Sequence, residues 1–326
     1  MGIKKAKKEI YYSKVMLFGE YSIILGSMGL TIPYAHFNGE LKFINKTSYT
    51  DLDFAQNSNQ QIRELNNYIS DLKKNKQLLH DFNSEKLAKD LDDGLYFESS
   101  IPEGYGLGSS GALVAALYNE YTLDRIESRA GIKMSEMLEL KKNFAQIESF
   151  YHGTSSGIDP LICYLKHPLV LENKNQISSV GIPRKDILDE DAIFLINSGK
   201  PGKTAPLVKL FMEKIKDSSF LKAIEDELIP MTNTCIENML KGNLNTVFTI
   251  LKQLSAFQLD KLPEMIPASF KEIWKYGLKS DDFTLKLCGS GGGGFILGFT
   301  RKYSTTKAYF NELGLEMIPV YREVIK

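Results

Sequence analysis

One stretch of the chain places closely spaced glycines and serines between an expected strand and an expected helix. It reads Pro102-Glu103-Gly104-Tyr105-Gly106-Leu107-Gly108-Ser109-Ser110-Gly111-Ala112. The preceding residues 95–100 favour a strand, and residues 109–124 favour a helix because they are rich in alanine and leucine. Glycines at alternating positions allow a tight turn and a close approach of the backbone to a ligand. On its own, the stretch predicts an anion site and an ordinary glycine-rich turn equally well.

In the anion-site interpretation, the loop amides and the dipole of the following helix hold a phosphate group. The loop is not the phosphate loop of P-loop enzymes, because no lysine follows its last glycine. Serines at the helix start can cap the helix or bind a metal ion that accompanies the phosphate. The residues predicted to bind the phosphate-bearing ligand are Gly104, Gly106, Leu107, Gly108, Ser109 and Ser110.

A second region places two carboxylates near the end of an expected helix, residues 135–151, for which Ser135 is a candidate N-cap. Glu148 lies in the last turn, and Asp159 follows eleven residues later in a Gly/Ser turn. A kinase needs a carboxylate to hold magnesium, and often another to orient or deprotonate the attacking hydroxyl. Taken alone, a residue such as Glu148 is more often a solvated helix residue, and one such as Asp159 more often a turn former.

Two further stretches are ambiguous when each is considered alone. Residues 286–295 contain five glycines within six positions between two expected strands, which exceeds the needs of a hairpin turn and suits close packing against a phosphate or a substrate. Lys14 lies in a strongly apolar strand within residues 13–21. A lysine in that setting either reaches the surface or stabilises charge at a site.

Composition and charge argue against several classes of function. The chain has 326 residues, and its 40 Lys and Arg balance 40 Asp and Glu, so no basic excess indicates a nucleic-acid partner. No stretch approaches the roughly 20 apolar residues of a membrane span, and the basic run 4–8 is expected to be a solvated terminus. Cys163, Cys235 and Cys288 predict neither a zinc site nor a disulfide framework. We therefore expect a cytoplasmic protein.

Strands and helices interleave in both halves of the chain, which predicts an α/β or α+β protein with two domains. Residues 10–25 favour strand around a turn at Gly19-Glu20. The other expected strands are 30–37, 41–44, 95–100, 169–171, 192–196, 284–288, 294–299 and 317–324, and the expected helices are 59–92, 109–124, 135–151 and most of 204–278. The loop with Asn173, Lys174, Asn175 and Pro183 is the best candidate for the domain boundary.

These four stretches, in this order, resemble the GHMP kinase superfamily, named for galactokinase, homoserine, mevalonate and phosphomevalonate kinases. The resemblance covers the whole chain and rests on three motifs, at residues 14–26, 102–112 and 286–294. It implies an α+β, two-domain GHMP kinase fold. Residues 1–175 would form an N-terminal ATP-binding domain similar to ribosomal protein S5 domain 2, and residues 176–326 a ferredoxin-like C-terminal domain.

Within the superfamily, the chain resembles mevalonate kinases most, through Glu148, His152-Gly153 and Ser156-Gly157-Ile158-Asp159. This implies that Asp159 is the catalytic base or orienter, and that Lys14 lowers the pKa of the substrate hydroxyl and stabilises charge. It also implies that Ser110 and Glu148 bind Mg²⁺. The residues expected beside the phosphoryl acceptor are Glu20, Tyr21, Thr204, Gly289, Ser290 and Gly291.

The activity implied by the resemblance is transfer of the γ-phosphoryl group of ATP, with Mg²⁺, to the hydroxyl of a small hydroxy acid. Mevalonate, giving 5-phosphomevalonate for isoprenoid precursor synthesis, is the first expectation. Phosphomevalonate kinase and diphosphomevalonate decarboxylase are the alternatives, and a homodimer is left open.

The chain departs from the motifs of mevalonate kinases at three positions. Tyr21 stands where the family usually has histidine, and a G-E-Y sequence is more typical of phosphomevalonate kinases. Gly202 replaces an arginine two residues before Thr204, and Gly111 replaces an alanine in the glycine-rich loop. Because Tyr21 and Gly202 are expected near the acceptor, these departures concern which molecule is the acceptor and do not concern the use of ATP.

Overall fold

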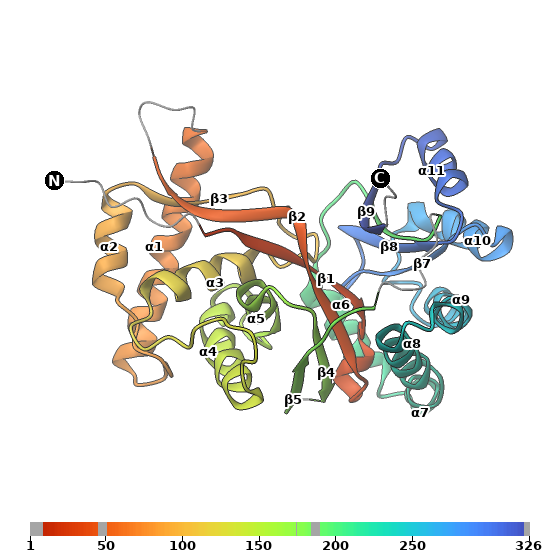
Figure 1. The fold of residues 1–326 in the computed structure, drawn as a ribbon, viewed down its shortest axis with the longest axis horizontal. Helices are drawn as coiled ribbons and strands as arrows, with labels where there is room; N and C mark the ends of the chain where they lie inside the picture. Colours follow the sequence, from red (N-terminus) through yellow and green to blue (C-terminus); the bar gives the residue numbers. More distant parts are fainter. Residues whose placement is uncertain (1–8, 45–50, 174, 184–189, 323–326) are drawn as a thin grey trace. The chain divides into compact units, whose positions relative to one another are not determined.

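The computed structural model describes residues 9–44, 51–173, 175–183 and 190–322 (Figure 1). The chain divides into two compact units, each assembled from separated segments. Unit 1 consists of Met1–Lys14, Pro33–Pro102 and Gly108–Lys166, and unit 2 of Val15–Ile32, Glu103–Leu107 and His167–Lys326. The chain therefore passes from one unit to the other within the glycine-rich loop, after Leu107. The division into domains at residue 175 stays a prediction.

A five-stranded sheet contains the long strands of the first half of the chain. Its strands are β1 (Tyr11–Phe18), β2 (Gly29–Phe43), β3 (Leu95–Ser99), β4 (Leu169–Asn173) and β5 (Gln176–Ser179). The order is β1-β2-β4-β5, and β3 pairs with the other end of β2, antiparallel from Gly39–Ser99 to Phe43–Leu95. The expected strands 30–37 and 41–44 are thus one continuous strand.

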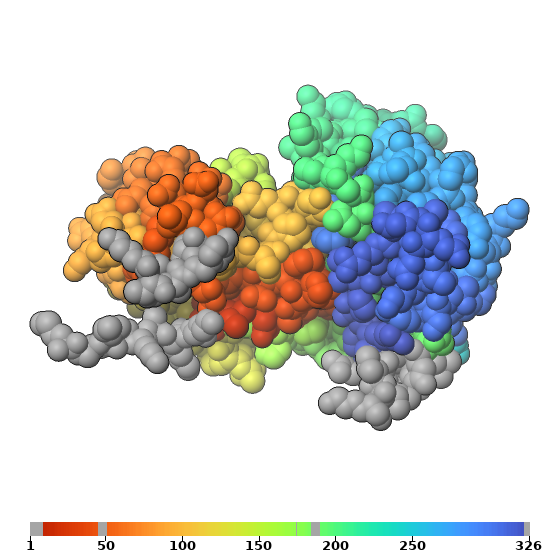
Figure 2. All heavy atoms as spheres, turned by 90° about the horizontal axis from the view of Figure 1, so that it is seen from above, coloured from red at the N-terminus to blue at the C-terminus, as the bar shows by residue number. Residues whose placement is uncertain are grey.

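The helices of unit 1 pack against one another and against β3. They are α1 (Leu52–Lys74), α2 (Ser84–Asp92), α3 (Ser109–Tyr121), α4 (Met134–His152) and α5 (Ile158–Leu165). In Figure 1, α3, α4 and α5 form one group, while α1 contacts α2 and β3. Helix α1 buries Ile62, Leu65 and Ile69 on one side and exposes polar residues on the other. Figure 2 shows the outer surface of α1 and α2 in orange.

Helix α3 is the central helix of unit 1, and its composition explains how closely its neighbours approach it. Nine of its residues are buried, and four of these are glycine or alanine: Gly111, Ala112, Ala115 and Ala116. An ideal Cβ atom on Gly111 would lie 2.7 Å from the carbonyl carbon of Asp159 in α5. The alanine that the family usually has here does not fit at this packing distance, and this explains the departure at Gly111.

Unit 2 contains a four-stranded antiparallel sheet in the order β7-β8-β6-β9. Its strands are β6 (Ala192–Asn197), β7 (Thr284–Leu287), β8 (Phe295–Thr300) and β9 (Met317–Arg322). Helices connect β6 to β7 and β8 to β9, and β7 runs into β8 through the glycine-rich stretch. This βαββαβ order, with its first strand between the third and the fourth, is the ferredoxin-like arrangement, so the predicted α+β fold class is confirmed.

The remaining helices all belong to unit 2. They are η1 (Ser22–Leu25), α6 (Thr204–Lys214), α7 (Ser218–Ala223), η2 (Ile224–Leu228), α8 (Ile229–Lys241), α9 (Leu244–Lys261), η3 (Ala268–Phe270), α10 (Lys271–Ser280) and α11 (Tyr303–Glu312). In Figure 1, α8 and α9 lie side by side, and α9 and α10 contact β7. Within the described ranges, none of the helices has the length and apolarity needed to span a membrane.

Several local predictions are wrong. Residues 22–25 form the 3₁₀-helix η1 and not strand, because positive φ angles at Gly19, Tyr21 and Gly26 turn the chain away from the sheet. Ser135 is not an N-cap, since α4 begins one residue earlier and Glu136 accepts a hydrogen bond from the amide of Lys133. Helices α5 and α11 and strand β5 were not predicted from the sequence. The basic run 4–8, Lys174 and residues 323–324 lie outside the described residues.

The packing at Gly111 gives a stability prediction. Gly111→Ala should destabilise the protein by about 1–3 kcal/mol, because the added methyl group must push α5 away, and this exceeds the helix-propensity gain of alanine. Gly181→Ala is the matched control, because its Cβ would have no atom within 4 Å. Urea denaturation of the two variants measures the difference. A Gly111→Ala variant as stable as the control would contradict the close packing of α3 on α5.

Candidate active site

Unit 1 brings together the lysine and the carboxylate that were predicted to be catalytic. Lys14 lies in β1, and Asp159 lies in the first turn of α5, after Gly157 with φ of 71°. The Lys14 Nζ atom is 3.1 Å from Asp159 Oδ2. The lysine side chain is 7% exposed and the aspartate 34%, so the ammonium group is buried while the carboxylate stays accessible.

The second half of the glycine-rich loop lies directly on this pair. Gly108 is the N-cap of α3, with φ of 77°, and an ideal Cβ atom there would lie 3.0 Å from Cγ of Lys14. A side chain at this position would therefore meet Lys14, and the φ angle itself favours glycine. Ser109 and Ser110 begin α3, so the loop leads into the helix N-terminus as the sequence predicted.

Glu148 is the most buried acidic side chain of the cluster, at 3% exposure. Ser110 Oγ donates a hydrogen bond of 3.3 Å to its Oε1 atom, and Ser155 Oγ donates to Oε2. Burial, followed by the charge of Asp159, raises the pKa of Glu148 to about 7, although both serines and the Lys14 charge act in the opposite direction. Burial and the charge of Asp159 thus make ionisation of Glu148 unfavourable.

Two polar side chains of this cluster were not among the predicted site residues. His152 Nε2 lies 3.3 Å from Ser110 Oγ, and Ser155 both contacts Glu148 and accepts a 3.0 Å hydrogen bond from the amide of Gly157. The spacing of four residues places His152 on the same side of α4 as Glu148, which was a usable signal. Ser155 gave no such signal, because it lies in an irregular turn.

In unit 2, three loops are joined through their backbones, at residues 104–107, 198–204 and 288–294. The amide of Gly202 donates to Gly104 O at 2.9 Å, and the amide of Gly294 donates to Lys200 O at 2.7 Å. Ideal Cβ atoms on Gly202 and Gly294 would lie 2.8 Å from Gly291 O and from Tyr105 Cα. The glycines of the third motif are therefore needed for backbone-to-backbone packing.

This junction explains why the chain has no arginine at position 202. Any side chain there would have to displace the carbonyl group of Gly291. Gly104, Gly106 and Leu107 form one of the three loops, and Gly289 and Gly291 belong to another. Their predicted roles in binding ligands stay predictions.

Tyr21, Ser290 and Thr204 form a chain of polar contacts in unit 2. The Tyr21 hydroxyl donates to Ser290 O at 2.5 Å, and Ser290 Oγ donates to Thr204 Oγ1 at 3.0 Å. The Tyr21 ring packs against Phe211, with ring centroids 4.8 Å apart, and burial raises the pKa of its hydroxyl well above the usual value. Three of the six residues predicted beside the acceptor thus lie together, although their contact with an acceptor stays a prediction.

Glu20 is turned into the interior of unit 2, where it forms an ion pair with Lys286. The Lys286 Nζ atom lies 2.6 Å from Glu20 Oε1 and also donates to Leu287 O at 2.7 Å. The two side chains are 0% and 2% exposed. The pair connects the first and third sequence motifs and fixes Glu20 beside Tyr21. The substrate role predicted for Glu20 stays a prediction.

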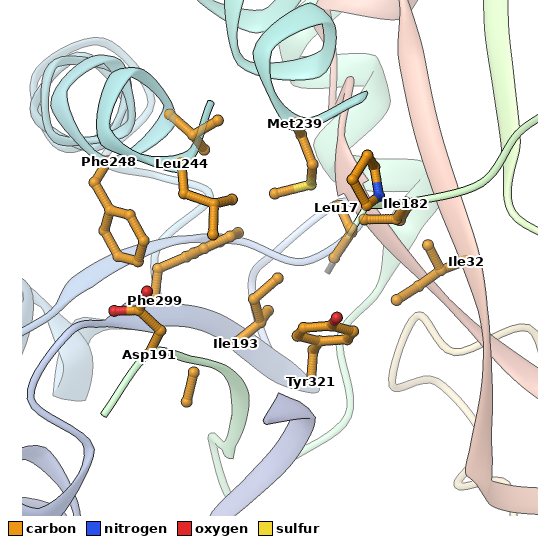
Figure 3. A pocket seen from close by; sticks show the side chains of 13 residues that line it. Leu17, Ile32, Ile182, Asp191, Ile193, Met239, Leu244, Phe248, Phe299 and Tyr321 are labelled. Atoms are coloured by element: carbon orange, nitrogen blue, oxygen red, sulfur yellow. The ribbon is translucent and has the colours of Figure 1, made fainter. Parts of the chain in front are cut away.

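Unit 2 also contains an apolar hollow that includes none of the predicted site residues. Figure 3 shows Met239, Leu244 and Phe248 extending from the helices toward Ile193 and Tyr321 of the sheet. Almost all of its lining is apolar. It lacks the convergent polar groups that would identify it as a catalytic site.

The buried ion pair gives a stability prediction. Lys286→Met should lower the free energy of unfolding by about 3–5 kcal/mol, because it leaves the carboxylate of Glu20 buried without this cation. The double variant Lys286→Met, Glu20→Gln should lose less, since a buried amide costs less than a buried carboxylate. Urea denaturation of both variants measures the difference. A double variant less stable than the single variant would contradict this interpretation.

The raised pKa of Glu148 predicts how stability depends on pH. In the absence of metal and nucleotide, the folded protein holds a proton on Glu148 up to about pH 7, whereas the unfolded chain loses it near the ordinary value of 4.5. The free energy of unfolding should therefore fall between pH 5 and pH 7.5, by an amount on the order of 2 kcal/mol. Glu148→Gln should lack this component, and parallel denaturation of both proteins in EDTA isolates it. Identical pH profiles would show that Glu148 does not titrate in this range.

Comparison with known proteins found one family model and several solved structures to which this chain is similar. The family GHMP kinases N terminal domain matches residues 72–167. The L. major mevalonate kinase in complex with R-mevalonate has a TM-score of 0.63 at 16% identity, covering 98% of each chain. Streptococcus pneumoniae phosphomevalonate kinase, in complex with phosphomevalonate and AMPPNP, has a TM-score of 0.59 at 16% identity, covering 98% of this chain and 100% of its own.

A galactokinase is similar to a comparable degree. The Lactococcus lactis enzyme complexed with galactose has a TM-score of 0.61 at 15% identity, covering 97% of this chain and 94% of its own. A search of curated protein sequences found no match. At identities this low, the structural similarity shows the fold alone. Residues 72–167 are a GHMP kinase N-terminal domain, and the chain as a whole has the fold of the GHMP kinase superfamily.

Proposed function

We propose that this protein is an ATP-dependent kinase that transfers the γ-phosphoryl group to the hydroxyl of mevalonate, giving 5-phosphomevalonate. The observation that carries the proposal is the cluster in unit 1. There, the ion pair of Lys14 and Asp159 lies against Gly108, and Ser110 and Glu148 are hydrogen-bonded at the start of α3. Gly108, Ser110, Glu148, Asp159 and Lys14 all belong to unit 1, and this supports a shared role for them in phosphoryl transfer.

The nucleotide phosphates are assigned to the glycine-rich loop. Gly104, Gly106 and Gly108 have φ angles of 76°, 74° and 77°, and α3 begins immediately afterwards. Successive backbone amides next to a helix N-terminus form a site for anions. Leu107, Ser109 and Ser110 complete the segment. This assignment needs no lysine from a P-loop motif.

Magnesium is assigned to Ser110 and Glu148. An octahedral Mg²⁺ keeps neighbouring ligand oxygens about 2.9 Å apart, and Ser110 Oγ and Glu148 Oε1 are 3.3 Å apart, so the pair fits with a small closure. The buried carboxylate, with its raised pKa, is short of positive charge, and a divalent cation would supply it. Among the described residues, no group of three or more His, Cys, Asp or Glu could hold a metal alone. The remaining ligands would be phosphate oxygens and water, which Mg²⁺ prefers. When bound, Mg²⁺ neutralises charge on the phosphates.

Asp159 and Lys14 are assigned to the phosphoryl transfer itself. The carboxylate of Asp159 accepts the proton of the acceptor hydroxyl while the hydroxyl oxygen forms a bond to the γ-phosphorus atom. The bond from that phosphorus to the bridging oxygen breaks, and ADP leaves with the electron pair. The Lys14 ammonium group, 3.1 Å from Asp159, favours the ionised hydroxyl and stabilises charge on the transferred group.

The acceptor is assigned to Tyr21, Thr204 and Ser290, with Glu20, Gly289 and Gly291 around them. Mevalonate is proposed first because the pattern of Glu148, His152-Gly153 and Asp159 is similar to that of mevalonate kinases. Phosphomevalonate is the second candidate acceptor. Tyr21 favours it, because a G-E-Y sequence is more typical of phosphomevalonate kinases. Lys200 and Lys203, next to Thr204, could meet the additional phosphate.

Coupled ATP turnover with mevalonate and with phosphomevalonate, measured side by side, tests the proposal. We expect turnover with mevalonate to exceed that with phosphomevalonate by at least tenfold, with Mg²⁺ required. Release of CO₂ from diphosphomevalonate would identify the decarboxylase instead. Turnover with none of these acceptors would remove this pathway from consideration.

Asp159→Asn is the matched catalytic variant. We expect kcat to fall by about 10²–10⁴-fold, because an amide cannot accept the hydroxyl proton, whereas the Kd of AMPPNP should change by less than threefold. Isothermal titration calorimetry measures this Kd independently of turnover. Full activity of Asp159→Asn would exclude Asp159 as the base.

A further inference from the structure

His152 is a polar side chain at the site that has no role in the proposed mechanism. It is the last residue of α4, one turn after Glu148, and it is exposed. Its Nε2 atom lies 3.3 Å from Ser110 Oγ, the same distance as that between Ser110 Oγ and Glu148 Oε1. The Ser110 hydroxyl therefore has two potential hydrogen-bond partners at equal distance.

When a serine hydroxyl binds a metal ion, its proton needs an acceptor that does not bind the same ion. A serine hydroxyl has one proton and two lone pairs. When a lone pair binds a cation, the proton must point away from the cation, toward another acceptor. If Glu148 Oε1 binds the same cation, it lies on the cation's side of Ser110 Oγ, so a proton that points away from the cation is poorly directed toward Oε1. Among the residues described around Ser110, His152 Nε2 is the acceptor that remains.

We infer that His152 is a positioning residue for magnesium: its Nε2 atom accepts the Ser110 hydroxyl proton and so directs a Ser110 lone pair toward the cation. This inference rests on the proposed function. It requires the imidazole to be neutral, with its proton on Nδ1. Removing a residue that hydrogen-bonds to a metal ligand typically lowers metal affinity about 10–100-fold.

The surrounding contacts support this assignment over a second role at Glu148. Ser155 Oγ already donates to Glu148 Oε2, and the amide of Gly157 donates to Ser155 Oγ, so the far side of the carboxylate is held by the turn before α5. Ser110 contacts both the Glu148 carboxylate and the His152 imidazole. The hydrogen-bond series therefore runs from Gly157 through Ser155, Glu148 and Ser110 to His152.

A different role is conceivable for a histidine at this place, namely a protonated imidazole that donates to a nucleotide phosphate. The two roles make opposite demands on a replacement side chain. His152→Gln keeps an uncharged acceptor near the position of Nε2, whereas His152→Lys keeps a cation and removes the acceptor. His152→Leu removes both.

The experiment measures the Kd of ADP by isothermal titration calorimetry, once with Mg²⁺ and once with EDTA, for each variant. The ratio of the two Kd values is the coupling between metal and nucleotide. We expect His152→Gln to keep the wild-type ratio within threefold, and His152→Leu and His152→Lys to reduce it about 10–100-fold. The Kd in EDTA should stay the same in all variants, which also shows that they are folded.

A double variant tests whether the effect passes through Ser110. Ser110→Ala should reduce the ratio by itself, and adding His152→Leu to it should cause no further loss. Additive losses, or a ratio kept by His152→Lys and lost in His152→Gln, would overturn the inference. A wild-type protein whose affinity for ADP is unaffected by Mg²⁺ would contradict the proposed function itself, whereas a wild-type response that all His152 variants retain would contradict only this inference.

Discussion

The geometry of the cluster formed by Lys14, Asp159, Ser110 and Glu148 depends on the close contact between α3 and α5. Because Gly111 has no side chain, the helix that begins with Ser109 and Ser110 can lie against the backbone of Asp159. The same contact places Gly108 against Lys14. A bulkier residue at Gly111 would separate Gly108 and the start of α3 from Asp159 and Lys14. The glycine that departs from the family motif therefore determines how closely α3 approaches Asp159.

Glycines have a comparable function in unit 2, where they join three loops. The packing of Gly202 on the carbonyl of Gly291 leaves no space for the arginine that the resemblance predicted. An acceptor that relied on this arginine must be bound differently here, and Tyr21, Ser290 and Thr204 provide a connected set of hydroxyl groups nearby. The departure at Gly202 is thus accompanied by close packing of its backbone on Gly291.

The sequence predicted the elements with strong local patterns and missed relations between distant residues. Strand β3, helix α3 and the two glycine-rich stretches were readable because each has its own composition. The 3₁₀-helix at residues 22–25 was not, since its apolar run fits a strand, and the positive φ of Tyr21 is a tertiary effect. The pairing of Glu20 with Lys286, 266 positions apart, had no local signal either. The spacing of His152 from Glu148 indicates that both lie on one side of α4, but no local pattern indicates the contact of His152 with Ser110.

The residues of the cluster in unit 1 also interact through their charges. Glu148 and Asp159 repel each other, and burial adds to the cost of ionising Glu148, so the pKa of Glu148 is raised although Lys14 is near. One lysine cannot balance two carboxylates, and the cluster in its metal-free form therefore favours a proton on Glu148. A divalent cation bound with nucleotide would replace that proton and leave Lys14 to pair with Asp159. Metal binding would thus be linked to the protonation state of Glu148, which Asp159 influences although the two carboxylates are eleven residues apart in the chain.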